Sequence, residues 1–201
     1  MDRVPTPAAI LQPLFYYDLG DPECYLVAER IMSSLPSVPE WEPVLASAME
    51  PAGSASERGW REQLEHRALK LGIQPLRWPA VWPPDSRDAM LAATYAKRIG
   101  RAVAFSLAAF RQAFAGGRDL GDQDTILIAG AACEMHPSAL LKGIALRSNR
   151  EALTAAVRRA RQAGVRSLPA IAVGDALFQG EGALEAATAA LETTGAAIKP
   201  A

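Results

Sequence analysis

The chain has 201 residues, of which 50% are hydrophobic and 21% are charged, and its net charge is −1. This balance is typical of a globular protein that is long enough to bury a substantial core. Basic and acidic residues are mixed along the chain, so neither a nucleic-acid partner nor an anionic membrane surface is expected. The two cysteines, Cys24 and Cys133, and the isolated His66 and His136 have no metal-ligand spacing, so no metal is expected.

The first 13 residues contain three prolines and only a short apolar run. Such a run is too short and too interrupted for a signal peptide or a membrane-spanning helix. We therefore expect a cytoplasmic location, a reducing compartment in which the two cysteines stay unpaired.

The chain opens with a predicted β-α-β unit. An aromatic strand at 14–19 ends at Gly20, and apolar residues then recur at helical spacing from Pro22 to Pro36. A second short strand is predicted at 41–46, where Pro43 suits an edge position. Two such strands around a helix are expected to run parallel.

The middle of the chain predicts helices almost without interruption. Residues 51–56 form a loop and a candidate boundary, and the Trp- and Pro-rich stretch 76–84 predicts an extended connector. The predicted helices are 57–72, 85–99, 102–114, 122–132, 137–146 and 149–163.

Strand character returns at 168–173 and 176–178, which predict a hairpin, and a last helix is predicted at 182–193. The predicted fold class is α/β, with one sheet built from a β-α-β half and a β-β-α half around a large helical insertion. On this prediction, residues 14–50 and 164–193 form one discontinuous domain, and residues 56–163 form the inserted helical domain.

The turn Asp21-Pro22-Glu23-Cys24 lies where the first strand meets the first helix. Free N–H groups at a helix start favour an anion there, which makes this turn the candidate reaction site. Asp21 is a catalytic acid or base, an anchor for a substrate cation, or simply the cap of the helix. Cys24 is either a reactive or glutathionylated thiol or a small buried residue. Asp18 either sets the acidity of the site or bonds the nearby backbone.

These segments resemble the DsbA family of thioredoxin-like proteins over residues 14–193. Residues 15–26 resemble the family's strand, Cys-Pro-x-Cys turn and first helix, and residues 164–170 resemble its Gly-Val-x-Gly-Val-Pro-Thr segment, whose proline peptide is cis. Three stretches resemble the helical domain of the 2-hydroxychromene-2-carboxylate isomerase and kappa-class glutathione transferase branch. They are 82–86, 108–114 and 119–122.

The resemblance implies a thioredoxin-like fold and a site for a small thiol, with glutathione as the candidate cofactor. Pro22 and Pro169 are expected at this site, and Leu168 is expected to bind through its backbone. Glu181 stands beside the position where the branch carries an Asp-Arg pair for glutathione, and that pair is absent here. Trp82 either lines a pocket for an aromatic substrate or packs the helical block onto the sheet. The branch commonly forms homodimers, so a homodimer is expected.

The chain departs from the family at a residue that carries out the family's chemistry. Disulfide exchange needs an attacking thiolate and a second thiol three residues later, but the first position here is Asp21. Three hypotheses remain open. The protein is a thiol-dependent oxidoreductase relative that acts through Cys24 alone; or it is a glutathione-dependent isomerase or transferase in which Asp21 replaces the branch's Ser; or it is a non-catalytic member that binds a ligand or partner.

Overall fold

The computed structural model describes residues 12–49 and 57–196 of the chain. The loop and domain boundary predicted around residues 50–56 therefore lie outside the described residues. Within the described part, no helix is both long enough and apolar enough to cross a membrane.

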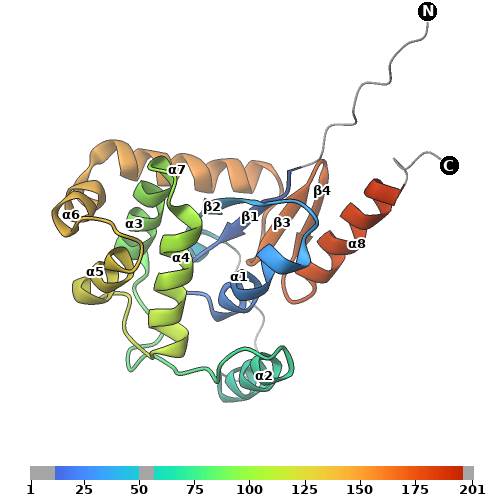
Figure 1. Cartoon of the computed structure of the whole chain (residues 1–201), viewed down its shortest axis with the longest axis horizontal. Coiled ribbons are helices and arrows are strands. Elements are labelled where there is room, and N and C mark those ends of the chain that lie inside the picture. The colour runs from blue at the N-terminus through green and yellow to red at the C-terminus, as the bar shows by residue number, and fades with distance from the viewer. Residues whose placement is uncertain (1–11, 50–56, 197–201) are drawn as a thin grey trace, which may run out of the picture.

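Four strands form one sheet in the order β2-β1-β3-β4 (Figure 1). β1 (Leu14–Tyr17) pairs in parallel with β2 (Glu40–Pro43), whereas β3 (Ala170–Val173) pairs antiparallel with both β1 and β4 (Ala176–Gln179). The sheet thus joins strands from the two ends of the chain, as predicted, and Pro43 lies on an edge strand.

The second strand is shorter than the predicted 41–46. Val44 still donates to the Tyr17 carbonyl at 2.9 Å, and the backbone then turns so that the N–H of Ala46 donates to the Asp18 carboxylate at 2.7 Å. Residues Ala46–Ala48 then form a short 3₁₀ helix, η1.

The helices confirm the predicted mixed α/β fold, with six of the eight described α-helices lying between β2 and β3. Figure 1 shows α1 and α8 beside the sheet, with the inserted helices at its other side and α2 below. The bounds are α1 Pro22–Ser34, α2 Glu57–Lys70, α3 Arg87–Arg98, α4 Ala102–Phe110, α5 Gln123–Ala131, α6 Pro137–Ala145, α7 Arg147–Gln162 and α8 Ala183–Ala196.

An aromatic cluster joins the insertion to the sheet. Phe15 and Tyr17 of β1 stack with their ring centroids 5.4 Å apart. Trp41 of β2 makes T-shaped contacts with these two rings, at centroid distances of 5.1 and 5.4 Å. The hydroxyl of Tyr17 forms a buried 2.6 Å hydrogen bond with the Ser106 hydroxyl on α4. Because both partners are buried, this bond fixes α4 against β1.

The helix predicted at 102–114 changes character after Phe110. Arg111–Ala115 form a π-helical turn, η2, in which the N–H of Gly116 donates to the carbonyl of Arg111 at 2.8 Å. Gly116 permits this wider turn, because a Cβ there would lie 2.7 Å from the Gln112 carbonyl oxygen.

Gly143 of α6 provides a test of how tightly the helices pack. A Cβ at this position would lie 2.4 Å from Cγ of Tyr95 on α3. We expect Gly143→Ala to lower the free energy of unfolding by about 1–3 kcal/mol, because the core is already filled. Urea denaturation measures the change. Gly182→Ala is the control, since a Cβ at Gly182 meets nothing within 4 Å; equal stability of both variants would contradict the predicted packing.

Candidate functional site

Asp18 anchors the turn that follows β1. Its side chain is 2% exposed and accepts hydrogen bonds from the N–H of Gly20 at 2.8 Å and of Ala46 at 2.7 Å. The Ser86 hydroxyl bonds the same carboxylate. Burial raises the pKa of Asp18, and these hydrogen bonds act in the opposite direction. Asp18 therefore bonds nearby backbone, as one of its two interpretations predicted.

Asp21 caps α1, with its carboxylate accepting from the N–H groups of Glu23 at 2.8 Å and Cys24 at 3.3 Å. It remains partly exposed. Burial, followed by repulsion from Glu23, raises the pKa of Asp21 to about 7, against the lowering effect of its backbone hydrogen bonds. The capping role and an acid–base role are thus compatible, because the capping carboxyl titrates near neutral pH.

Cys24 is fully buried, with 0% of its surface exposed. Burial, followed by the charge of Asp21, raises the pKa of the Cys24 thiol well above its usual range. A buried thiol that stays protonated is a poor nucleophile. The geometry favours Cys24 as a small core residue.

The Leu168–Pro169 segment reaches the turn through the sheet. β3 pairs Ala170 with Tyr16, which places Leu168 and Pro169 alongside the end of β1. The Leu168–Pro169 peptide bond is cis. Within the described residues, neither the N–H nor the C=O of Leu168 has a hydrogen-bond partner, so its backbone is free to pair with an extended ligand.

Gln179 positions that segment, a role that the sequence did not reveal. Its Oε1 accepts from the N–H groups of Arg166 at 2.7 Å and Ser167 at 3.1 Å, and its Nε2 donates to the Gly164 carbonyl at 3.3 Å. One side chain of β4 thus holds the whole loop that leads to Leu168.

Arg67 of α2 links two acidic residues at the site, a second feature that the sequence did not reveal. Its Nη1 lies 3.7 Å from Glu23 in the turn, and its Nε lies 3.2 Å from Glu181 after β4. Glu181 is 72% exposed. The insertion therefore places a cation beside the turn. The same cation forms an ion pair with Glu181, which the sequence analysis named as a candidate site residue.

Trp82 belongs to a cluster of three tryptophans. Its ring lies 5.0 Å from Trp78 and 5.8 Å from Trp60, and the Arg61 guanidinium lies over Trp78 and Trp82 at 4.6 and 5.1 Å. These contacts favour packing of α2 against the connector.

Pro22, the first residue of α1, is buried.

The predicted residues thus fall into two groups. In the first group, the turn and the segment that contains Pro169 lie at the same end of the sheet. Glu181 joins this group because Arg67 contacts both Glu181 and Glu23 of the turn. Trp82 forms the second group, because its aromatic contacts are with Trp60 and Trp78.

Within residues 12–49 and 57–196, no group of His, Cys, Asp and Glu could hold a metal ion.

Known structures share this fold. A 2-hydroxychromene-2-carboxylate isomerase matches with a TM-score of 0.80 at 18% identity, covering 94% of this chain and 100% of the other. A probable DsbA oxidoreductase from Streptomyces coelicolor matches with a TM-score of 0.76 at 17% identity, covering 95% and 92%. The cytosolic disulfide reductase DsbM from Pseudomonas aeruginosa, solved with GSH, matches with a TM-score of 0.64 at 16% identity, covering 92% and 100%.

Comparison with curated protein sequences finds no match. The model of the DSBA-like thioredoxin domain, in contrast, matches residues 14–192. That match spans the sheet, the helical insertion and the candidate site. The chain therefore belongs to the family of DSBA-like thioredoxin domains.

Proposed function

We propose that this protein is a thiol-dependent enzyme in which the reacting sulfur belongs to a bound small thiol, with glutathione as the candidate, and in which Asp21 transfers the proton. One observation carries the proposal: the first motif position holds a partly exposed carboxyl group with a pKa of about 7, while Cys24 is completely buried. The proposal corresponds to the isomerase or transferase hypothesis. It assumes the cytoplasmic location that the sequence analysis expects.

The proposed proton transfer begins with ionised Asp21 and a neutral thiol. The carboxylate accepts the thiol proton, which leaves a thiolate at the N-terminus of α1, where helix N–H groups stabilise negative charge. Protonated Asp21 is then neutral, so it no longer repels the thiolate and can donate a hydrogen bond to it. When the thiolate adds to an electron-poor double bond of the substrate, the π bond breaks and its electron pair moves onto the substrate. Asp21 then donates its proton to the substrate anion that results. A pKa near neutrality suits both directions of this transfer.

The binding of glutathione is proposed to use three features of the described residues. The unpaired backbone of Leu168 pairs with the extended peptide. The cation of Arg67 and the anion of Glu181, 3.2 Å apart, offer both signs of charge to the charged ends of the ligand. They replace the Asp-Arg pair that the sequence lacks.

The thiolate is proposed to act on a small aromatic substrate. Support comes from the similarity to the 2-hydroxychromene-2-carboxylate isomerase. A homodimer stays a prediction of the sequence resemblance.

Asp21 should make stability depend on pH. Its folded pKa of about 7 lies above the value of about 3.9 for an unfolded chain. The folded state therefore binds this proton more tightly, and the stability it contributes is present below about pH 4 and lost as the pH rises through 7. We expect Asp21→Asn to be more stable than the wild type at pH 8 by about 1–3 kcal/mol, discounted for partial exposure, and equally stable below pH 4.

Urea denaturation across this pH range measures the difference. Asp122→Asn is the matched control, because Asp122 caps α5 in the same way, through the N–H of Asp124 at 3.0 Å, but is exposed. A difference between wild type and Asp21→Asn that stays constant with pH would contradict the raised pKa.

Glutathione binding tests the proposed role of Arg67. We expect calorimetric titration to show micromolar to millimolar affinity, and Arg67→Gln to weaken it about tenfold through loss of a charged contact. Arg98→Gln is the control, since Arg98 is also an arginine of the insertion but bonds Ser148 instead of Glu23 or Glu181. If glutathione does not bind to the wild type, the proposed cofactor is wrong.

The thiol of Cys24 should be inert in the folded protein. We expect Ellman's reagent to label Cys24 slowly under native conditions and rapidly in urea, because its side chain has no exposed surface. Cys133→Ala removes the other thiol and isolates the signal of Cys24. Fast native labelling would overturn the proposal and favour the oxidoreductase hypothesis, in which Cys24 acts alone.

A further inference from the structure

The helix α4 is apolar on every side. Its sequence, AVAFSLAAF, holds one polar residue, Ser106, and the hydroxyl of that residue is buried against Tyr17. The positions that face outward are apolar too: Val103, Leu107 and Ala108 are half-buried and Ala104 is exposed. A helix that is apolar all round is normally covered all round. The outward side of α4 is therefore a candidate surface for a partner.

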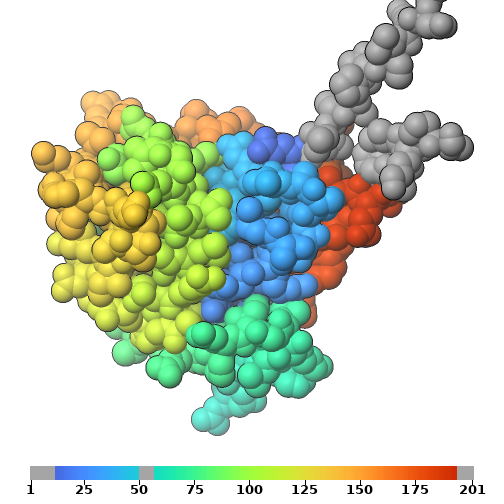
Figure 2. Space-filling view, in the orientation of Figure 1, coloured from blue at the N-terminus to red at the C-terminus, as the bar shows by residue number. Residues whose placement is uncertain are grey.

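The neighbouring helix α5 extends this apolar surface. The two helices pack on each other, and Figure 2 shows their segments adjoining at the surface of the molecule. After the first turn of α5, the outward residues are Leu127, Ile128, Ala131 and Ala132, and Ile128 is 40% exposed. Contiguous apolar surface marks sites of protein association. We call the outward residues of both helices the α4–α5 face: 103, 104, 107, 108, 127, 128, 131 and 132.

One end of the α4–α5 face attracts negative charge. The start of α4 has no side-chain cap, and the N–H groups of residues 102–104 have no partner among the described residues. These residues line an open hollow of about 800 Å³. Arg101, whose side chain is 41% exposed, adds positive charge there, with Glu134 at 3.7 Å, and Glu40 across the hollow is paired with Lys97 at 2.8 Å. Free N–H groups at a helix start favour a carboxylate.

The other end of the α4–α5 face carries negative charge. Arg101 at the start of α4 donates to the carbonyl of Cys133, just after the end of α5, so the two helices run antiparallel. The start of α5 therefore lies beside the end of α4. Asp122 and Asp124 are exposed there, and neither forms an ion pair with a described residue.

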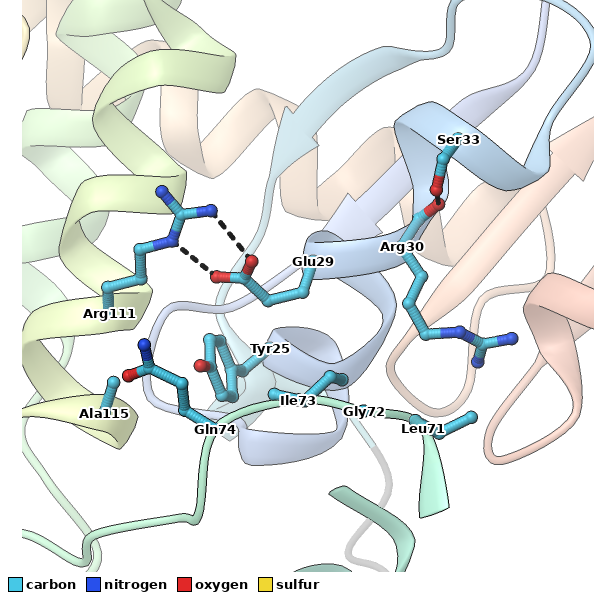
Figure 3. Close-up of a pocket in the computed structure, with 10 residues that line it drawn as sticks. All are labelled: Tyr25, Glu29, Arg30, Ser33, Leu71, Gly72, Ile73, Gln74, Arg111 and Ala115. Carbon is cyan, nitrogen blue, oxygen red and sulfur yellow. Dashed lines mark hydrogen bonds and ion pairs between the residues drawn. The ribbon is translucent and has the colours of Figure 1, made fainter. Parts of the chain in front are cut away.

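The arginines near that end do not neutralise these two aspartates. Arg111 donates from Nε and Nη2 to Glu29 at 2.7 and 2.8 Å, as Figure 3 shows. Arg118 contacts the hydroxyl of Thr125 at 3.4 Å and pairs with no acidic residue in the described part of the chain. The α4–α5 face thus has a donor end, an apolar middle and an acidic end.

We infer that the α4–α5 face is the interface of a homodimer, in which α4 lies antiparallel to α4 of a second copy. Two-fold symmetry brings the same face of both copies together. The antiparallel arrangement places the acidic end of each copy on the donor end of the other, so the face complements itself. Asp124 of each copy then reaches the hollow of the other and accepts from the N–H groups of residues 102–104. This inference is independent of the proposed thiol chemistry, because no residue of the face belongs to the candidate site.

Sedimentation equilibrium of the full chain measures the oligomeric state. We expect a dimer with a dissociation constant of about 10 µM or less. Ile128→Lys is expected to weaken the dimer at least about a hundredfold, because the interface would bury an unpaired charge. Met32→Lys is the control, since Met32 is 44% exposed on α1, outside the face. A wild type that is monomeric at about 100 µM would overturn the inference. A dimer that Ile128→Lys leaves intact would also overturn it.

Asp124→Asn tests the antiparallel arrangement. We expect the dissociation constant of the dimer to rise about tenfold, because the N–H groups at the start of α4 lose a charged acceptor. Asp88→Asn is the matched control, since Asp88 is also an exposed acidic residue in the first turn of a helix, but of α3. If Asp124→Asn dimerises as tightly as the wild type does, the inference is wrong. Glutathione affinity and the labelling of Cys24 are expected to stay unchanged in Asp124→Asn, which separates the two proposals.

Discussion

The buried carboxylate of Asp18 is the constraint on which the candidate site depends. Removing a carboxylate from water is costly unless hydrogen bonds replace the lost solvation. Here the partners come from three separate segments: Gly20 in the turn, Ala46 after β2, and Ser86 at the start of α3. Because all three must meet at Asp18, the turn is held in one position relative to both the sheet and the insertion. The N–H of Asp21 also donates to the Asp18 carbonyl at 3.1 Å, so the capping residue is held in place together with Asp18.

Two electrostatic effects oppose each other at the start of α1. The free N–H groups of the helix favour negative charge, and Asp21 uses them as a cap. Burial and the neighbouring carboxylates of Glu23 and Asp18 disfavour a further negative charge, and these effects are stronger, since the pKa of Asp21 is raised. Arg67 lies beside Glu23 rather than bonding Asp21. The cation of the insertion therefore offsets the outer carboxylate and leaves the capping carboxyl able to titrate near neutral pH.

Local patterns in the sequence were sufficient for the fold but not for all of the site. The periodicity after Pro22 and the Gly174-Asp175 turn depend on neighbouring residues, so both the helix and the hairpin could be predicted. The contacts of Arg67 with Glu23 and Glu181 join residues far apart in the chain, and nothing in the local sequence of α2 indicates them. The space-filling view shows the segment around α2 lying against the N-terminal part of the chain (Figure 2).

The burial of Cys24 is consistent with chemistry in which the thiol is supplied by a ligand. A two-thiol cycle needs the second cysteine to reach and resolve a mixed disulfide, so its sulfur must stay accessible to the first. With Asp21 at the first position, no mixed disulfide forms there, and that requirement is removed. The second sulfur is then free to fill the core beneath the turn, where a small apolar side chain stabilises the fold. With Asp21 in place of the first thiol, the turn keeps its position at the helix start but lacks the pair of thiols that disulfide exchange needs.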